Sequence, residues 1–459
     1  MFFNLMSPPS QHKAAAPLRF GLRAMLMVAV WLLFVVVAEQ IVGNTLQISS
    51  LDVAGKLTWS QALVPGVCAV EVAATLDGNW QPGKNSFTTN SSGGTTVPVT
   101  ATNNQFLRLR AVDVSATGAG FTNLIQSYGL LETVAGRGDG RVDNTSYWQT
   151  TFEGGPATNA ALSRPHYAMA DRAGNIYIAD KNSHSVLRVD THGLIHTHAG
   201  THTGGYNGDG PMAATSMQLN YPNALWVRAD GTVYVLDTDN GRVRRIATNG
   251  VATTLFYADS LGAALAGGRQ LWVKDDESLA YFGNKTKLRQ WTAAGNSVTT
   301  LTKDFIELGD FFVENSGDLI VADRLDNYIY RITPTGGTTL IAGNGQATGG
   351  GDGQPALATG FGGPRGVWGV PTGGYLLLLH DGAQLWYIDA ANIAHLLVNG
   401  LGGNTFMHAG DGQYFYAPDQ LKIGEGRSVV LDAAGNILIC ESDYGFVRRI
   451  RFQRMDSKN

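Results

Sequence analysis

The sequence has little of several features that would assign it to a common class of protein. Charged residues make up 15% of its 459 residues, the formal net charge is −4, and no run of lysine and arginine exceeds two residues. Nucleic acids are bound mainly through clustered basic side chains that neutralise phosphates. We therefore exclude nucleic acid as a partner.

Cysteine is also scarce. Small exported domains often depend on disulfides, but this chain has two cysteines, Cys68 and Cys440, in segments that we assign to different domains. Cys440 replaces the alanine of a repeated strand, which predicts a buried small apolar residue. A bridge between the two cysteines is the less favoured alternative.

Near the N-terminus, the apolar run is short. Fifteen uncharged residues extend from Ala24 to Ala38, after Arg19 and Arg23 and before Glu39. A bilayer span needs about 20 apolar residues, whereas a secretory signal needs fewer and ends on small residues such as Val36 and Ala38. We expect residues 1–38 to be a signal peptide or, if uncut, a transmembrane anchor. The protein is then exported to the periplasm, the cell surface or the medium, and meets the membrane only through this segment.

Glycine is abundant, with 58 residues, and one glycine lies in each copy of a segment that recurs four times. Each copy is a glycine-containing turn, a short apolar strand and a terminal carboxylate, as in Gly174–Asp180 (GNIYIAD). Eight residues after each carboxylate, an arginine lies in a second apolar strand. The four pairs are Asp180 with Arg188, Asp237 with Arg245, Asp323 with Arg331, and Glu441 with Arg449.

These pairs predict a charge-assisted bond between neighbouring strands. A catalytic role is the alternative, but an active site needs one set of residues rather than four. Weaker copies without the acid and the arginine occur at 279–291 and 375–388. Units of about 40 to 60 residues, each made of short strands and glycine-rich turns, are typical of β-propeller blades. We count six blades.

The repeats resemble those of the NHL family of β-propellers. The resemblance rests on Gly174–Asp180, on the arginine strand that follows, on the Ala-Gly pairs at 135–136, 199–200, 342–343 and 409–410, and on the Gly-Asp-Gly loops at 208–210 and 351–353. It implies an all-β fold, a six-bladed propeller over residues 129–453, and says little about function.

The ring of blades has a predicted closure. The last unit stops near Phe452 without an outer strand, while residues 129–136 match such a strand and precede the first blade. We expect residues 130–134 to pair with 447–452, which would remove the open sheet edge.

A separate module precedes the repeats. Segments 56–59, 69–74, 96–100 and 106–110 alternate apolar and polar residues, which predicts half-buried antiparallel strands. Residues 45–115 are similar to fibronectin-like modules, which implies a small β-sandwich. The glycine-rich segment 116–128 is expected to be a linker.

Aligning the first, innermost strand of each blade identifies candidate binding residues. Its first position is expected at one mouth of the central channel, and holds His166, Asn223, Arg269, Gly309, Arg365 and Arg427. Converging arginines attract carboxylate or phosphate groups. The alternative is that these side chains pair with nearby carboxylates or backbone carbonyls. The long loops 137–163, 201–219 and 343–362 are expected to contribute to the same site.

Three positions further along these strands lie large aromatic residues. Trp226, Trp272, Phe312 and Trp368 could stack on a sugar or an aromatic ligand, although such a layer more often fills the space between sheets.

Metal ligands are sparse at these positions. His196 and His198 alternate on one expected outer strand and would share a face, but no acid or cysteine nearby completes a set. Related propeller enzymes, peptide-amidating lyases and gluconolactonase-like hydrolases, hold a metal in the channel through His, Glu, Asn or Asp. Here His166 and Asn223 alone would suit, and the arginines would repel a cation. No Gly-x-Ser-x-Gly elbow or phosphate-cradling loop is present.

These patterns favour a non-enzymatic binding or scaffold module for a protein, a glycan or a small anion. The alternative function is that of a metal-dependent lyase or lactonase-like hydrolase. No cofactor is expected, with calcium or zinc left open. The sequence leaves the oligomeric state undetermined.

Overall fold

The computed structural model describes residues 46–52, 55–64, 66–73, 75, 81–88, 90–96, 106–113, 129–138, 144–302, 304–371, 373–400, 411–414 and 422–452. The expected signal segment and linker lie outside these ranges. Across the described ranges the chain forms β-strands and short 3-10 helices, with no α-helix. Among these residues, no helix has the length and apolar character that a membrane span requires.

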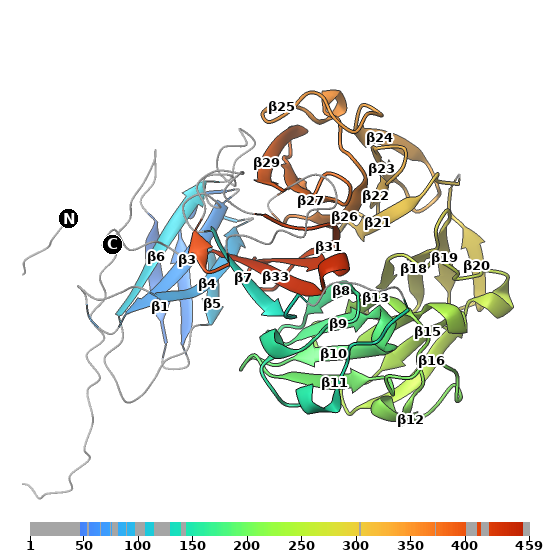
Figure 1. Cartoon of the computed structure of the whole chain (residues 1–459). Helices are drawn as coiled ribbons and strands as arrows, with labels where there is room; N and C mark the ends of the chain where they lie inside the picture. Colours follow the sequence, from blue (N-terminus) through green and yellow to red (C-terminus); the bar gives the residue numbers. More distant parts are fainter. Residues whose placement is uncertain are drawn as a thin grey trace, which may run out of the picture.

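The first six strands form two three-stranded antiparallel sheets, drawn in blue in Figure 1. One has the order β1-β2-β5 and the other the order β4-β3-β6. The strands are β1 (Gln47–Leu51), β2 (Lys56–Ser60), β3 (Gly66–Ala73), β4 (Gln81–Thr88), β5 (Gly93–Thr96) and β6 (Phe106–Asp113). Leu57 and Trp59 of one sheet join Cys68, Val70 and Leu109 of the other in a single buried cluster. The alternation in β2 therefore places its apolar face against the second sheet.

Within the described residues, six antiparallel sheets of four or five strands follow. The first contains β8 (Pro165–Ala170), β9 (Ile176–Asp180), β10 (Ser185–Val189) and β11 (Ile195–Ala199). The second contains β13 (Pro222–Val227), β14 (Val233–Asp237), β15 (Arg242–Ile246), β16 (Val251–Tyr257) and the short β12 (Met212–Ala213). The third contains β17 (Leu271–Val273), β18 (Leu279–Gly283), β19 (Leu288–Thr292) and β20 (Ser297–Thr300).

The remaining three sheets repeat this plan. The fourth contains β21 (Leu308–Val313), β22 (Leu319–Asp323), β23 (Tyr328–Ile332) and β24 (Thr338–Ala342). The fifth contains β26 (Pro364–Gly369), β27 (Tyr375–Leu379), β28 (Gln384–Ile388), β29 (Ile393–Asn399) and the short β25 (Gln354–Pro355). The sixth contains β31 (Gly426–Leu431), β32 (Ile437–Glu441), β33 (Phe446–Phe452), β7 (Gly129–Ala135) and the short β30 (Gln413–Tyr414).

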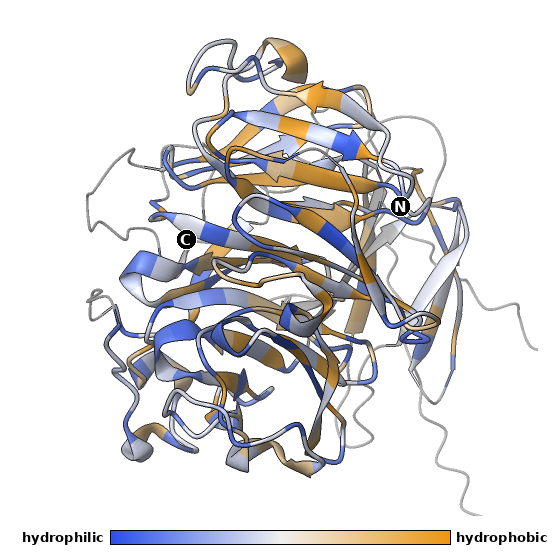
Figure 2. Cartoon of the chain, turned by 90° about the vertical axis from the view of Figure 1, so that its right-hand side faces the viewer, coloured by the Kyte–Doolittle hydropathy of each residue, from blue (hydrophilic) through white to orange (hydrophobic). Residues whose placement is uncertain are grey.

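The second strand of a sheet is buried on both of its faces. All residues of β9, β14, β22, β27 and β32 are buried. A strand covered on both faces needs a continuous apolar run rather than an alternating one, and the repeated apolar segments supply it. Figure 2 shows these hydrophobic stretches inside the stack of sheets and hydrophilic residues in the connecting turns.

The sheets surround a common centre. First strands contact one another in succession, with β8 against β13, β13 against β17, β21 against β26, β26 against β31, and β31 against β8 (Figure 1). One buried cluster joins Tyr167, Leu225, Trp368 and Val429 from four of these first strands. The fold is therefore all-β and propeller-like, with its core between neighbouring sheets.

The predicted pairing of the two ends of this region is confirmed. Strand β7 lies antiparallel to β33, with Leu131 opposite Ile450. Leu131, Ala135, Val447 and Ile450 are buried. A strand from before the first of these sheets thus supplies the fourth strand of the last one.

The predicted acid–arginine pairs are wrong. In each hairpin the arginine lies opposite the residue three positions before the acid: Arg188 opposite Tyr177, Arg245 opposite Tyr234, Arg331 opposite Ile320, and Arg449 opposite Leu438. Successive residues of a strand point to opposite faces, so an offset of three places Asp180, Asp237, Asp323 and Glu441 on the other face from these arginines. Three of the arginines bind different acids: Arg245 binds Glu277, Arg331 binds Glu314, and Arg449 binds Glu132.

The four repeated acids are buried and hold the loop before the first strand of their own sheet. Backbone N–H groups donate to them: Ser163 to Asp180 (2.7 Å), Asn220 to Asp237 (2.7 Å), Glu307 to Asp323 (3.1 Å) and Gly424 to Glu441 (2.8 Å). Two acids also bind an arginine seven residues on, Asp237 to Arg244 at 2.8 Å and Glu441 to Arg448 at 3.1 Å. In these four sheets the recurring acid therefore fixes the backbone two to three residues before the channel-mouth position.

Both cysteines are free and buried. Cys68 lies in the first pair of sheets and Cys440 lies in β32. Cys440 is fully buried, as its place in the repeated apolar strand predicts.

Candidate functional site

A repeated β-bulge carries the candidate residues of the channel mouth. In β8, for example, Pro165 lies opposite Asp180 and Tyr167 lies opposite Ala179, which leaves His166 as the extra residue. The same interruption leaves Asn223, Arg365 and Arg427 as extra residues in β13, β26 and β31, and Gly309 with Asp310 in β21. A bulge turns its extra residue out of the alternating pattern. Five of the first strands therefore have a bulge at the same position.

These residues line one cavity. It has an empty volume of about 280 Å³, including the part that opens to solvent, and its lining contains His166, Tyr167, Asn223, Gly268, Arg269, Gln270, Gly309, Asp310, Arg365 and Arg427. The five predicted ligand-binding residues thus come together. Gly309 cannot be replaced without movement, because a Cβ there would lie 2.5 Å from the carbonyl oxygen of Pro364. We call this cavity the channel-mouth pocket.

Glu307 forms ion pairs with three arginines. Its Oε1 lies 3.0 Å from Arg269 Nη2, 2.7 Å from Arg365 Nη1 and 3.1 Å from Arg324 Nη1. Burial alone would raise the pKa of Glu307, but Arg365, Arg269 and Arg324 outweigh burial and hold the pKa at about 2. One carboxylate therefore shares its charge among three guanidinium groups.

Positive charge is crowded around the pocket. Burial, and then repulsion from Arg269 and Arg324, lowers the pKa of Arg365 to about 9. Burial likewise lowers the pKa of Arg269 to about 10 and is the main cause of the low pKa of Arg427. Asp443 lies 3.7 Å from Arg427 and 3.6 Å from Arg164. Guanidinium groups keep their charge in proteins at neutral pH, so a second negative group in the pocket would relieve their mutual repulsion.

Two neutral side chains of the pocket have buried polar atoms without a hydrogen-bond partner. These atoms are Nε2 of His166 and Oδ1 of Asn223, and each residue is 8% exposed. The amide nitrogen of Asn223 donates to the carbonyl oxygen of Gly268 at 3.1 Å. Burial, followed by repulsion from Arg427, lowers the pKa of His166 well below its usual value, so the ring is neutral. Buried polar atoms of this kind usually meet a ligand or a water molecule.

Part of the pocket lining forms a chain of polar contacts. Gln270 donates from Nε2 to the hydroxyl of Tyr167, and its Oε1 accepts the N–H of Leu271 at 2.7 Å. Asp310 accepts the N–H of Phe311 at 2.7 Å, and burial raises the pKa of Asp310 well above its usual range. These contacts fix the positions of three lining residues, Tyr167, Gln270 and Asp310.

The predicted aromatic layer lies further along the same strands. Ring centroids are 6.2 Å apart for Trp226 and Trp272, 6.0 Å for Trp226 and Trp368, and 5.1 Å for Phe312 and Trp368. Trp226 of β13 and Trp368 of β26 belong to non-neighbouring sheets, so the rings meet across the centre of the fold. Trp226, Phe312 and Trp368 pack with the central buried cluster. This is the packing arrangement that we favoured, and a role in ligand stacking stays a prediction.

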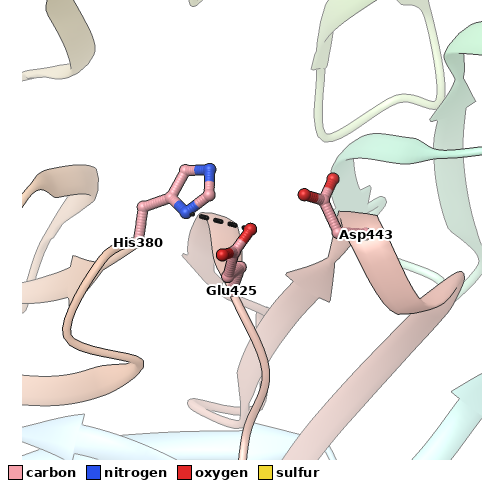
Figure 3. Close-up of side chains that lie close together, drawn as sticks. All are labelled: His380, Glu425 and Asp443. Atoms are coloured by element: carbon pink, nitrogen blue, oxygen red, sulfur yellow. Dashed lines mark ion pairs between the residues drawn. The ribbon is translucent and has the colours of Figure 1, made fainter. Parts of the chain in front are cut away.

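A second polar cluster, absent from the sequence-based candidates, adjoins the pocket (Figure 3). It contains His380, Glu425 and Asp443, whose ligand atoms lie within 4.8 Å of one another. Burial and repulsion from Arg427 lower the pKa of His380 to about 3, while burial and the neighbouring Asp443 raise the pKa of Glu425 to about 7. Among the residues that the structure describes, no other group of three such side chains is arranged to hold a metal ion.

His196 and His198 do not form the pair that strand alternation suggests. A bulge in β11 leaves His198 as an extra residue between Thr197 and Ala199 and interrupts the alternation. His196 lies between Glu153 (3.3 Å) and Asp190 (3.4 Å), whereas His198 packs edge-on against Tyr177.

Two of the long loops lie at outer edges rather than at the pocket. Strand β12, from the loop 201–219, pairs with the outer strand β16, and β25, from the loop 343–362, pairs with β29. Within the described residues, none of the three loops contributes to the pocket lining. A role of these loops in ligand binding stays a prediction.

Replacing Glu307 by glutamine tests how much its three ion pairs contribute to stability. We expect a loss of about 3 kcal/mol of stability, because three buried guanidinium groups would lose their shared charge. The matched control is Glu314→Gln, which breaks the exposed pair with Arg331 and should cost under about 1 kcal/mol. Chemical denaturation at pH 7 measures both, and equal effects would contradict this expectation.

Comparisons with known proteins support a β-propeller. No family model matches the chain, and no curated protein matches it significantly. A solved structure of a protein of unknown function from Bacteroides thetaiotaomicron has a TM-score of 0.53 and 13% identity, covering 89% of this chain and 98% of that chain. An auxiliary nutrient binding protein from Bacteroides ovatus has a TM-score of 0.52 and 13% identity, covering 86% and 94%.

A putative gluconolactonase is also similar, with a TM-score of 0.45 and 10% identity, and covers 72% of this chain and 96% of that chain. Identities this low show likeness of fold alone. Function therefore has to be argued from the pocket.

Proposed function

We propose that the chain is an exported, six-bladed NHL-type β-propeller that acts as a non-enzymatic binding module. In this proposal residues 45–115 form a fibronectin-like sandwich, residues 116–128 form a linker, and residues 129–453 form the propeller. The ligand binds at the channel-mouth pocket through a negatively charged group, a carboxylate or a phosphate, carried by a small molecule, a glycan or a protein.

The convergence of Arg269, Arg365, Arg427, His166 and Asn223 on one cavity is the observation that supports this proposal most strongly. Five of the six first strands carry an extra residue at the same point, which directs side chains from distant parts of the sequence to one place. Here Nε2 of His166, Oδ1 of Asn223 and Nε of Arg427 have no hydrogen-bond partner.

The charge balance favours an anion over a cation. Three guanidinium groups line the pocket, those of Arg269, Arg365 and Arg427, whereas the one carboxyl group in the lining, that of Asp310, has its pKa raised well above its usual range by burial. Guanidinium groups also match the geometry of carboxylates and phosphates, to which they can donate two parallel hydrogen bonds. Because the volume of the pocket includes space that opens to solvent, its enclosed part suits one such group rather than a large ligand.

Calorimetric titration with sulfate, phosphate and citrate at low ionic strength tests the proposal. We expect saturable binding of at least one of them, weakened ten-fold or more by Arg427→Gln, which removes a charge that lines the pocket. The control is Arg331→Gln, whose exposed pair with Glu314 lies in β23; it should leave the affinity unchanged. The absence of binding, or equal affinity in both variants, would contradict the proposal.

The second candidate function is that of a metal-dependent lyase or lactonase-like hydrolase. The cluster of His380, Glu425 and Asp443 beside the arginines favours it. The discriminating measurement is turnover of an aldonolactone by the zinc-loaded protein, followed through proton release. Turnover lost in Glu425→Gln would establish the enzyme, whereas its absence would leave the binding module as the supported function.

A further inference from the structure

Three elements bring His380, Glu425 and Asp443 together. His380 follows β27 directly, Glu425 precedes β31, and Asp443 lies in the 3-10 turn Ser442–Tyr444 after β32. Strand β27 contacts β31, so the end of one sheet lies beside the loop that enters the next. Figure 3 shows the imidazole and the two carboxylates directed toward a common space.

The spacing between His380 and Glu425 is too long for a hydrogen bond and suits a shared ion. Nδ1 of His380 lies 3.6 Å from Oε2 of Glu425, and a hydrogen bond between nitrogen and oxygen spans about 2.7–3.2 Å. Ligands at about 2.0–2.2 Å from a tetrahedral metal ion lie roughly 3.3–3.6 Å from each other. The three ligand atoms, all within 4.8 Å of one another, need only small shifts to reach that arrangement.

The imidazole of His380 provides an independent observation. The residue is 5% exposed, and its buried Nδ1 has no hydrogen-bond partner. That atom is directed at Glu425 (Figure 3) and also lies 3.7 Å from Oδ1 of Asp381. A buried ring nitrogen without a partner is rare in a native structure. Its lone pair is available to a metal ion when the ring is neutral.

We propose that His380, Glu425 and Asp443 bind one divalent transition-metal ion of the zinc class. One imidazole nitrogen and two carboxylate oxygens are typical zinc ligands, and three protein ligands leave one position for water or for a ligand. Calcium is disfavoured because it takes six to eight oxygen ligands.

The metal site shares a residue with the ion pairs of the anion pocket. Oδ1 of Asp443 lies 3.7 Å from Arg427 and 3.6 Å from Arg164, and Arg427 lines the pocket. A metal ion that binds Asp443 weakens the ion pair between Asp443 and Arg427. Arg427 then attracts an anion more strongly. Linkage is reciprocal, so the anion strengthens metal binding by the same factor. The metal site stands without the proposed anion function, but this coupling depends on it.

Titration of the full chain with Zn²⁺ and with Co²⁺ tests the metal site. We expect one equivalent bound, with the visible absorption of four-coordinate Co²⁺. His380→Gln and Glu425→Gln should each weaken binding ten-fold or more. The control is His196→Gln, which removes an imidazole that also lies between two carboxylates, Glu153 and Asp190. The control should bind as the unaltered chain does.

Two results would overturn the metal site. One is the lack of saturable one-to-one binding by the unaltered chain, and the other is retention of full affinity in both His380→Gln and Glu425→Gln. Use of two substitutions on different loops guards against misfolding of one variant, and unchanged near-UV circular dichroism identifies a folded one.

Sulfate titration with and without Zn²⁺ tests the coupling separately. Zinc should raise sulfate affinity three-fold or more in the unaltered chain and have no effect in Glu425→Gln. If zinc binds and sulfate affinity does not change, the coupling is wrong while the metal site stands. If sulfate does not bind at all, the proposed anion function fails independently of the metal.

Discussion

Asp237→Asn should lower the free energy of unfolding by about 3–5 kcal/mol. Asp237 is fully buried and accepts a hydrogen bond from Nε of Arg244, whose side chain is also fully buried. The amide would leave that guanidinium without its negative partner inside the protein, which is the costly way to break a buried pair. The shift of the urea denaturation midpoint at pH 7 measures the effect.

Asp180→Asn is the matched control, because the corresponding position seven residues on is Leu187 rather than arginine. Asp180 accepts the N–H of Ser163, and burial raises its pKa to about 7. An amide oxygen can still accept that N–H group. We expect a loss of stability no larger than about 1 kcal/mol at pH 5, and a loss there comparable to that of Asp237→Asn would contradict this account.

The same residue gives the sign of a pH dependence. The folded-state pKa of Asp180 is above its unfolded value, so the proton stabilises the folded state fully below about pH 4, and this contribution is lost as the pH rises through 7. The loss amounts to roughly 4 kcal/mol at most. Asp180→Asn lacks this component, so its denaturation midpoint relative to the unaltered chain should rise between pH 5 and pH 8.

Removal of β7 should have the second large effect on folding. A variant that lacks residues 1–135 loses the strand that pairs with β33, together with the buried side chains of Leu131 and Ala135. The edge of β33 would then expose unpaired backbone groups and apolar surface, which promotes association. We expect loss of the cooperative unfolding transition and aggregation on size-exclusion chromatography.

A variant that lacks residues 1–128 is the control, since it keeps β7 and removes only what precedes it. It should remain monodisperse and unfold cooperatively. Cooperative folding of both truncated variants would show that β7 is not needed to complete the last sheet.

Much of the fold could be predicted because its signals are local. Strand positions follow from apolar runs between glycine turns, and the pairing of β7 with β33 follows from a missing outer strand at one end and a surplus one at the other. Both kinds of signal depend on sequence order and period alone. The pairing of individual side chains depends on strand register, which the period does not determine.

The acid–arginine pairs show why. A regular spacing of eight residues suggested contact, but contact across a hairpin depends on register. The acid lies opposite the residue five positions on, as Asp237 does to Arg242, so the arginine eight positions on faces away. The arginine seven positions on, Arg244, shares the acid's face and binds it.

Part of the candidate site could be predicted, because the position of a residue along its strand follows from the repeat. Alignment of the first strands places His166, Asn223 and the arginines at one level, which the pocket lining reflects. The bulges that direct them inward depend on hydrogen bonds between strands. Glu307, Glu425 and His380 reach the site from loops whose neighbours belong to other sheets. No local pattern marks these residues.

The most direct test of the account is a crystal of the chain soaked in selenate, with diffraction measured at the selenium absorption edge. Selenate is a tetrahedral dianion of the kind that the arginines should bind. The account predicts an anomalous peak inside the cavity lined by His166, Asn223, Arg269, Arg365 and Arg427. Peaks confined to other surfaces, with this cavity empty of selenium at saturating concentration, would contradict it.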